Sequence, residues 1–249
     1  MSEGRKNVPE LLAVLDSYYS KNELDGAGRF LETELDRAKK AGDWSAELSL
    51  LSEQMGYFRR AGDREKGIAA CEEGMEIIEE HGLGDSVSGA TVLLNAATTL
   101  KAFSLPERSA ELFLRVERVY GKLLRDDDYR MAGLYNNAAL TFVDLGNFAE
   151  AEKRYKKALS VLDRCRDSEN EKAVTFCNMA YMYAAVDPTD GRAEEVMKAA
   201  ERCLEDPETQ RDGYYAFTAS KCRSAFEYFG FFAFAEELGR RAEEIYEGN

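Results

Sequence analysis

The sequence repeats with a period of about 42 residues, and this period constrains the fold more than any other feature. Met55, Ala97, Ala139 and Ala180 stand 42, 42 and 41 residues apart at equivalent positions. Around each of them, apolar residues recur at intervals of three and four, which places them on one face of a helix. A period of this length is typical of stacked supersecondary units, each burying its apolar face against the next.

The clearest unit lies between residues 132 and 158. Its apolar and small residues are Tyr135, Ala138, Ala139 and Phe142, followed after a turn by Phe148, Ala151, Tyr155 and Ala158. The turn at 144–147 contains Gly146, which can take the left-handed conformation that ends a helix. The pattern therefore predicts two helices joined by a tight turn.

The same register recurs at 90–116 and 173–200 and more weakly near both ends. We therefore expect an all-α chain of twelve helices in six antiparallel pairs. The predicted pairs are 8–21 with 23–41, 43–61 with 63–81, 86–103 with 105–124, 129–145 with 147–165, 169–186 with 190–205, and 211–229 with 231–247.

These residues resemble the tetratricopeptide repeat (TPR), a helix–turn–helix unit with small residues where its two helices cross. The long period is similar to that of the repeats in kinesin light chains. The resemblance implies an α-α superhelix, which we expect to form a single solenoid domain over 1–249. Its core repeats would span 43–205, between an atypical N-terminal pair at 8–41 and an aromatic-rich capping pair at 211–247.

Composition disfavours several classes of function. The 33 basic and 47 acidic residues give a net charge of −14, which argues against binding to nucleic acids or anionic membranes. No run of 18 apolar residues occurs, so no membrane-spanning segment is expected, and nothing at the start resembles a secretory leader. Five scattered cysteines without a C-x-x-C pair indicate reduced thiols and a cytoplasmic protein.

Catalytic and cofactor motifs are also missing from the sequence. It contains no phosphate-binding glycine motif and no H-E-x-x-H, and its single histidine is His81. We therefore expect no catalytic residues, no metal and no cofactor, and the chain is predicted not to be an enzyme.

The resemblance implies that the first helix of each pair lines a concave groove. Acidic residues concentrate on the second helices, while 86–103 carries none. The groove is expected to bind a protein or a peptide. Its candidate residues are Asn95, Thr98, Lys101, Asn136, Asn137, Leu140, Asp144, Asn178 and Tyr181, with Arg59, Arg60 and Lys221 at its ends.

Asn95, Asn137 and Asn178 occupy the same repeat position. Asparagine in mid-helix costs about 0.6 kcal/mol relative to alanine, so its recurrence calls for an explanation. A carboxamide both donates and accepts hydrogen bonds, and it can clamp the main chain of an extended peptide. It can equally well bridge adjacent helices, and the sequence leaves both interpretations open.

The C-terminal segment carries nine aromatic residues within the 21 residues from 214 to 234. They predict either a tightly packed cap or an exposed patch that forms a homodimer or docks a partner. The candidate interface residues are Tyr214, Tyr215, Phe231, Phe232 and Phe234.

The sequence therefore predicts a non-catalytic scaffold that binds a protein or peptide. One alternative is a peptide-sensing regulator similar to bacterial helical-repeat proteins of the Rap type. We expect no DNA-binding segment before the first helix, and little room there for the N-terminal helical bundle that a Rap-like role requires. The other alternative is a structural module that self-associates through its aromatic end.

Overall fold

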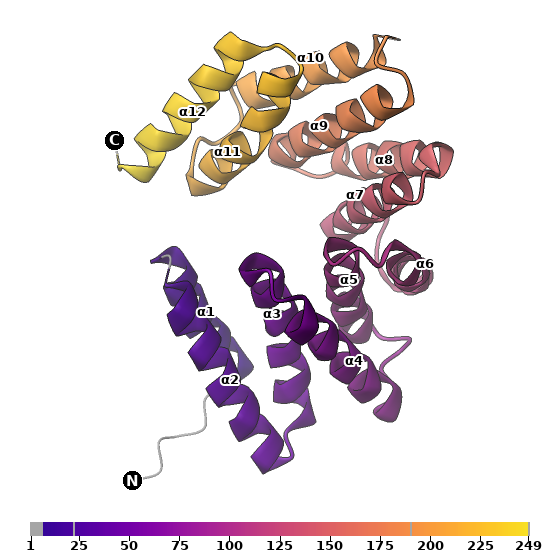
Figure 1. Ribbon diagram of the computed structural model, residues 1–249, viewed down its shortest axis with the longest axis vertical. Coiled ribbons are helices and arrows are strands. Elements are labelled where there is room, and N and C mark those ends of the chain that lie inside the picture. The colour runs from indigo at the N-terminus through magenta and orange to yellow at the C-terminus, as the bar shows by residue number, and fades with distance from the viewer. Residues whose placement is uncertain (1–6, 22, 190, 249) are drawn as a thin grey trace. The chain divides into compact units, whose positions relative to one another are not determined.

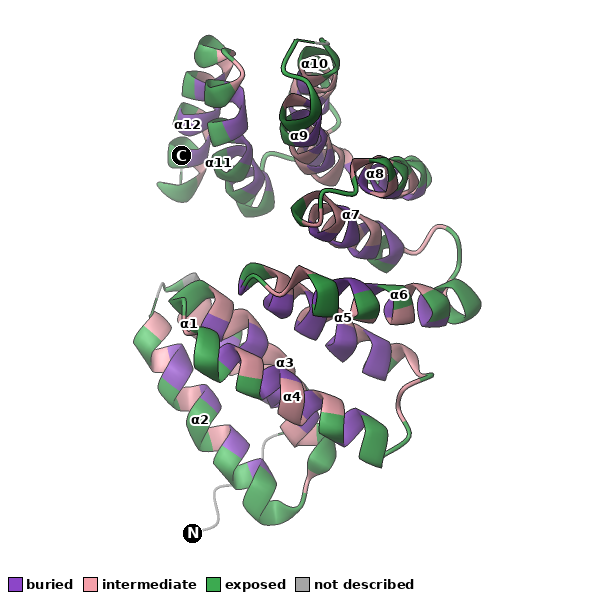
Figure 2. Ribbon diagram, turned by 45° about the vertical axis from the view of Figure 1, so that its right-hand side comes forward, coloured by how far each residue is buried: buried purple, intermediate pink, exposed green. Residues whose placement is uncertain are grey.

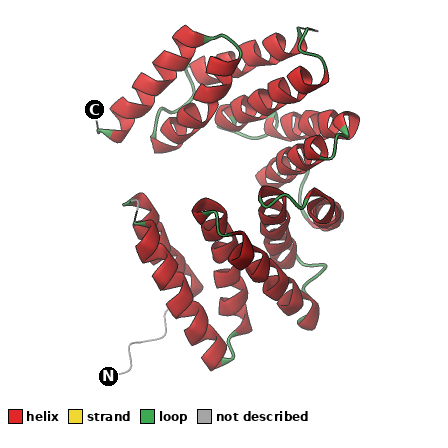
Figure 3. Cartoon of the chain, in the orientation of Figure 1, coloured by secondary structure: helices red, strands yellow, loops and turns green. Residues whose placement is uncertain are grey.

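The computed structural model describes residues 7–21, 23–189 and 191–248, and these contain twelve α-helices and no strand (Figure 3). The chain divides into two compact units, which we call unit 1, up to Leu123, and unit 2, from Leu124. The helices of unit 1 are α1 (Val8–Ser20), α2 (Leu24–Ala41), α3 (Trp44–Ala61), α4 (Arg64–Glu80), α5 (Val87–Ala102) and α6 (Pro106–Leu123). Those of unit 2 are α7 (Tyr129–Asp144), α8 (Phe148–Leu162), α9 (Glu169–Val186), α10 (Arg192–Glu205), α11 (Gly213–Tyr228) and α12 (Phe232–Tyr246).

The prediction of an all-α fold built from helix pairs is confirmed, with every described boundary within three residues of its expected place. The largest difference is at α8, which ends at Leu162 rather than at 165. There the N–H groups of Arg164 and Cys165 bond to carbonyls three residues back, those of Val161 and Leu162, so the helix tightens into a turn. The predicted start of α10, residue 190, lies outside the described residues.

Short turns explain why the pairs form where they do. Only two to five residues join each first helix to its second helix, which makes the two antiparallel. In the α3–α4 turn, Gly62 ends one helix at a φ of 72° and Asp63 caps the next by accepting the N–H of Lys66 at 3.1 Å. In the α7–α8 turn, Gly146 at a φ of 70° and Asn147 act in the same way.

In unit 1, α3 and α5 are neighbouring first helices, and α4 packs against both of them. Leu51, Met55, Leu93 and Ala97 are fully buried between these elements. At Gly67 on α4 the ring of Phe103 comes so close that an added Cβ would lie 2.4 Å from its Cε2. A larger residue at this position would force the ring of Phe103 to shift.

In unit 2, the first helices α7, α9 and α11 form one row, and the second helices α8, α10 and α12 form another row beside it (Figure 1). Helix α9 contacts α7, α8, α10 and α11, so it lies at the centre of the unit. Ala139 and Ala158 are fully buried, as expected of small residues where two helices cross, and Tyr155 is buried beside them. Buried and exposed residues alternate around the helices, as amphipathic sequences require (Figure 2).

No helix among the described residues is long and apolar enough to cross a membrane. The single solenoid domain expected over 1–249 stays a prediction.

Candidate functional site

Three parallel stripes of partly exposed residues run along the first helices of unit 2. Spacings of three and four put the members of each stripe on one side of its helix. We call this surface the first-helix face; its residues are Asn136 and Leu140 on α7, Asn178 and Tyr181 on α9, and Lys221, Ser224 and Tyr228 on α11.

A hydrogen bond joins the first two stripes at their centre. The Nδ2 of Asn178 donates to the Oδ1 of Asn136 at 3.2 Å, and both side chains are half-buried. Asn137 is half-buried next to Asn136, but the lateral partner of Asn178 is Asn136. The pair leaves one carboxamide N–H₂ on α7 and one carbonyl oxygen on α9 to interact with another molecule.

An aromatic cluster joins the second and third stripes. The ring of Tyr181 lies 5.4 Å from that of Tyr228 and 5.3 Å from that of Phe229, tilted by about 50° in both cases. Tyr181 is 40% exposed and Tyr228 is 69% exposed, so the cluster presents aromatic surface rather than burying it. Exposed aromatics of this kind are common anchors in protein interfaces.

A second polar row crosses the N-terminal ends of the same three helices. Tyr129, Glu171 and Tyr214 lie 42 and 43 residues apart in sequence, and the Tyr214 hydroxyl donates to the Glu171 carboxylate. Burial together with this hydrogen bond raises the pKa of Tyr214 to about 12. Burial and hydrogen bonding to Glu171 and Tyr214 also raise the pKa of Tyr129. The repeat period would have identified this row, although we did not predict it from the sequence.

The structure also places Leu140, Asp144 and Lys221, the remaining predicted residues of unit 2. Leu140 is half-buried in the α7 stripe, and Asp144 is exposed at the C-terminal end of α7. Lys221 is exposed in the middle of α11, one repeat away from Asn178. It supplies a positive charge within a strongly acidic chain.

The predicted residues of unit 1 fall into two groups. On α5, the Nδ2 of Asn95 donates to the Ser52 hydroxyl at 2.8 Å, so this asparagine bridges adjacent helices. Thr98 bonds back to the Leu94 carbonyl at 2.8 Å, and Lys101 is half-buried one turn further on.

The two arginines at the end of α3 differ in their surroundings. Arg60 lies over the ring of Tyr19 on α1, 4.7 Å from its centroid, and is held by this cation–π contact. Arg59 is more enclosed, and burial lowers its pKa. The joint role of these two arginines at a groove end stays a prediction.

The C-terminal aromatics are divided between a packed cap and the surface. Phe232 is 70% exposed and Tyr214 is 49% exposed. Phe231 and Phe234 instead pack against Phe226, with their ring centroids 5.8 and 4.7 Å from its ring centroid. Tyr215 is fully buried and does not belong to any surface patch, contrary to the prediction.

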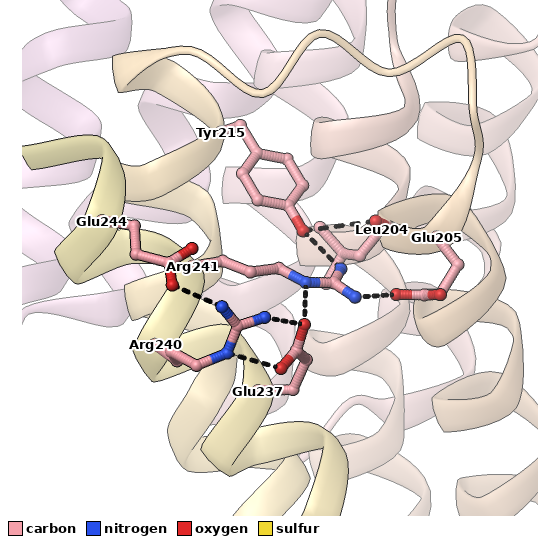
Figure 4. Close-up of polar contacts among 7 residues, drawn as sticks. All are labelled: Leu204, Glu205, Tyr215, Glu237, Arg240, Arg241 and Glu244. Carbon is pink, nitrogen blue, oxygen red and sulfur yellow. Dashed lines mark hydrogen bonds and ion pairs between the residues drawn. The ribbon is translucent and has the colours of Figure 1, made fainter. Parts of the chain in front are cut away.

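Tyr215 is buried because its hydroxyl takes part in a polar network beneath α12 (Figure 4). It donates to the Leu204 carbonyl at 3.3 Å and accepts from Arg241 at 3.0 Å. Arg241 also pairs with Glu205 and Glu237, each at 2.7 Å. This network joins α10, α11 and α12, so the cap is fixed by directed polar contacts as well as by packing.

Within the described part of the chain, no three histidine, cysteine, aspartate or glutamate side chains converge on a point that would hold a metal ion. Cys71, Cys177, Cys203 and Cys222 are buried free thiols. Burial raises the pKa of Cys71 and of Cys203 to about 12. These two thiols therefore stay protonated near neutral pH and serve as packing groups.

Comparison with known proteins gives structural likenesses only. No family model matches the sequence, and no curated protein matches it. Among solved structures, apo RapI superposes with a TM-score of 0.66 at 12% identity, over 98% of this chain and 85% of RapI. BtubC (BKLC) from P. vanneervenii superposes with a TM-score of 0.57 at 19% identity, over 91% of this chain and 90% of BtubC.

Two further structures are also similar. Nearly identical TPR-like repeats assigned to a kinesin light chain of Podosopora anserina give a TM-score of 0.58 at 15% identity, over 78% of this chain and 92% of theirs. The quorum sensor NprR, in complex with its cognate peptide NprX, gives 0.60 at 14% identity, over 94% of this chain and 66% of NprR. Identities this low establish a shared fold and nothing further.

Proposed function

We propose that this chain, a TPR-like helical repeat by its fold, is a non-catalytic scaffold that binds a protein or peptide on the first-helix face of unit 2. The observation that carries the proposal is the combination of carboxamides, a lysine and exposed tyrosines on three adjacent helices. These groups are suited to an extended or helical segment, because the carboxamides can bond to its main chain and the rings can pack against its apolar side chains.

The structures of similar fold support this proposal by example. NprR was solved with a peptide bound, so a fold of this kind accommodates one. The Asn136–Asn178 bond adds a constraint of its own. Because one amide hydrogen of Asn178 is already used between helices, we expect these asparagines both to bridge α7 and α9 and to orient the remaining amide groups toward the ligand.

Affinity capture from the native cell lysate tests the proposal, with two double variants beside the wild type. Tyr181→Ala/Lys221→Ala removes one exposed tyrosine and one lysine from the face. Tyr246→Ala/Lys198→Ala removes the same residue types elsewhere, since Tyr246 is 61% exposed at the end of α12 and Lys198 pairs with Glu194 on α10.

We expect the face variant to lose about tenfold or more in affinity for the captured partner and the control to stay within about twofold, because interface energy concentrates in a few anchors. All three proteins should melt at similar temperatures. Equal losses in both variants would contradict binding at this face.

A second candidate function, self-association through the C-terminal pair, is favoured by the exposure of Phe217, Tyr228 and Phe232, at 54%, 69% and 70%. Light scattering after size-exclusion chromatography at tens of micromolar checks it. A homodimer would elute at twice 28.0 kDa and return to monomer in Phe232→Ser. A strict monomer in the wild type would exclude it.

A further inference from the structure

A cavity of about 300 Å³ lies ahead of α9 and α11, away from the centre of the first-helix face. Residues 167–170, at the start of α9, and the segment at 206–214 form its walls, both within unit 2. Five of its nine lining residues are carboxylates and none is a lysine or arginine; the carboxylates are Asp167, Glu169, Asp206, Glu208 and Asp212.

Three of the five carboxylates have structural partners. Asp212 caps α11 by accepting the N–H groups of Tyr214 and Tyr215 at 2.9 and 3.0 Å. Glu169 pairs with Lys172 at 2.8 Å. Asp206 accepts the N–H of Glu208 at 2.8 Å, which uses one of its two carboxylate oxygens. Asp167, Glu208 and the second oxygen of Asp206 give the cavity its negative charge, and the wall supplies no cation to balance them. A cleft lined by one sign of charge attracts ions of the other.

Asn170 gives an independent indication of the ligand. Its side chain lines the same cavity, is 8% exposed, and its Oδ1 has no hydrogen-bond partner. Buried polar atoms are nearly always satisfied, so an orphan acceptor needs an explanation. A carboxamide oxygen only accepts, so the missing group must be an N–H or O–H donor.

The donor is better supplied by an organic cation than by a metal ion. In the described residues, no three ligating side chains converge closely enough to hold a metal. A guanidinium or ammonium group spreads several N–H donors over a wider area, which suits carboxylates that do not converge. Tyr214 is half-exposed at the rim, and its ring offers a face for a guanidinium to stack on.

We propose that this cavity binds an organic cation with several N–H donors, of the guanidinium or primary-ammonium class. The cation interacts with Asp167, Asp206 and Glu208 and donates to Asn170. It belongs either to a free small amine or to an arginine or lysine side chain of a partner. The inference goes beyond the proposed function, since it needs no residue of the first-helix face.

Titrations followed by ¹H–¹⁵N NMR test the proposal on the full chain at low ionic strength. N-acetyl-L-argininamide carries the side-chain form of the cation, and spermidine carries the free-amine form. We expect saturable shifts at the amides of 167–170 and 206–212. Tighter binding of N-acetyl-L-argininamide assigns the site to a partner's side chain, and tighter binding of spermidine assigns it to a free amine.

Two variants separate specific binding from charge screening. Glu208→Gln should weaken binding at least fivefold, whereas Glu195→Gln, exposed on α10 outside the cavity, should change it less than twofold. Asn170→Leu should weaken binding at least tenfold while its melting temperature stays equal or rises, because the leucine removes the unsatisfied oxygen. A purely structural asparagine would instead lower the melting temperature.

Three results would overturn the proposal. The first is the absence of saturable shifts at these amides with either probe. The second is an Asn170→Leu variant that folds and binds as the wild type does. The third is a response to tetramethylammonium or calcium chloride equal to that with the two probes, since neither salt offers N–H donors.

Discussion

At the scale of single residues, the fold depends on how closely its helices approach each other. Ala139 is fully buried and contacts a cluster that includes Tyr155, Met179 and Tyr183. The rings and thioethers around it fill the space that a longer side chain would need. Small residues at these positions are therefore a condition for the helix crossing.

The variant Ala139→Leu should lower the free energy of unfolding by roughly 1–3 kcal/mol, because three added carbons overpack this cluster. Urea unfolding followed by circular dichroism measures the change. The control is Ala149→Leu, the same substitution at an exposed position of α8, which should stay within about 0.5 kcal/mol of the wild type. Equal effects at both sites would refute the crossing at Ala139.

Substitutions of two glycines by alanine give a second matched comparison at the scale of single residues. Gly67→Ala would place a Cβ 2.4 Å from the Phe103 ring and should destabilise by roughly 1–3 kcal/mol. Gly121→Ala, on an exposed turn of α6 with no atom within 4 Å of the added carbon, should stabilise by about 0.5–1 kcal/mol. The two melting temperatures should move in opposite directions, and a shift of the same sign in both would contradict the close approach at Gly67.

At the scale of elements, cations on second helices cover aromatic rings on first helices. Arg154 lies 4.4 Å from the ring centroid of Phe142, and Arg192 lies 4.4 Å from that of Tyr183. Lys157 lies 4.8 Å from the ring centroid of Tyr135. This recurring contact accounts for the half-buried rings of Tyr135 and Phe142 within their helix pair.

The network at α12 should make stability depend on pH. The guanidinium groups of Arg240 and Arg241 lower the pKa of Glu237 from its ordinary value to about 2. A carboxylate with a lowered pKa stabilises the fold above its unfolded pKa, and this contribution is lost as the pH falls through the folded value. The contribution of Glu237 is therefore present near neutral pH and disappears between about pH 5 and pH 2.

The variant Glu237→Gln tests this dependence. The difference in unfolding free energy between wild type and variant should be largest near pH 7 and shrink steadily toward pH 2. Glu236→Gln, which removes an exposed carboxylate one position away, controls for the loss of charge alone. A difference for Glu237→Gln that grows as the pH falls would contradict the network.

At the scale of the whole chain, the sequence was sufficient to predict the helices but not their lateral contacts. The period of 42 residues and turns such as Gly62-Asp63 specify where each helix begins and ends, because these signals are local. The lateral partner of Asn178 is Asn136 rather than Asn137. Which of these two asparagines meets the next helix depends on packing and cannot be read from a single repeat.

The distribution of charge shows the same limit. The acidic second helices were predicted, but their pairing across repeats was not. In unit 1, Arg108 and Arg115 on α6 bond to Glu72 and Glu79 on α4, at 2.5 and 2.6 Å, with the same offset of 36 residues. Exposed pairs of this kind contribute little energy. Part of the acidic charge is thus engaged between helices, and the net charge of −14 does not by itself indicate a basic partner.

The most direct test of the central claim is site-specific photo-crosslinking. The chain carries benzoylphenylalanine in place of Tyr181 on the first-helix face, or in place of Lys156, whose side chain is 64% exposed on α8. Irradiation in the native lysate should give a discrete cross-linked partner from position 181 and none from position 156. Cross-links from position 156 alone, or equally from both positions, would show that the partner binds elsewhere.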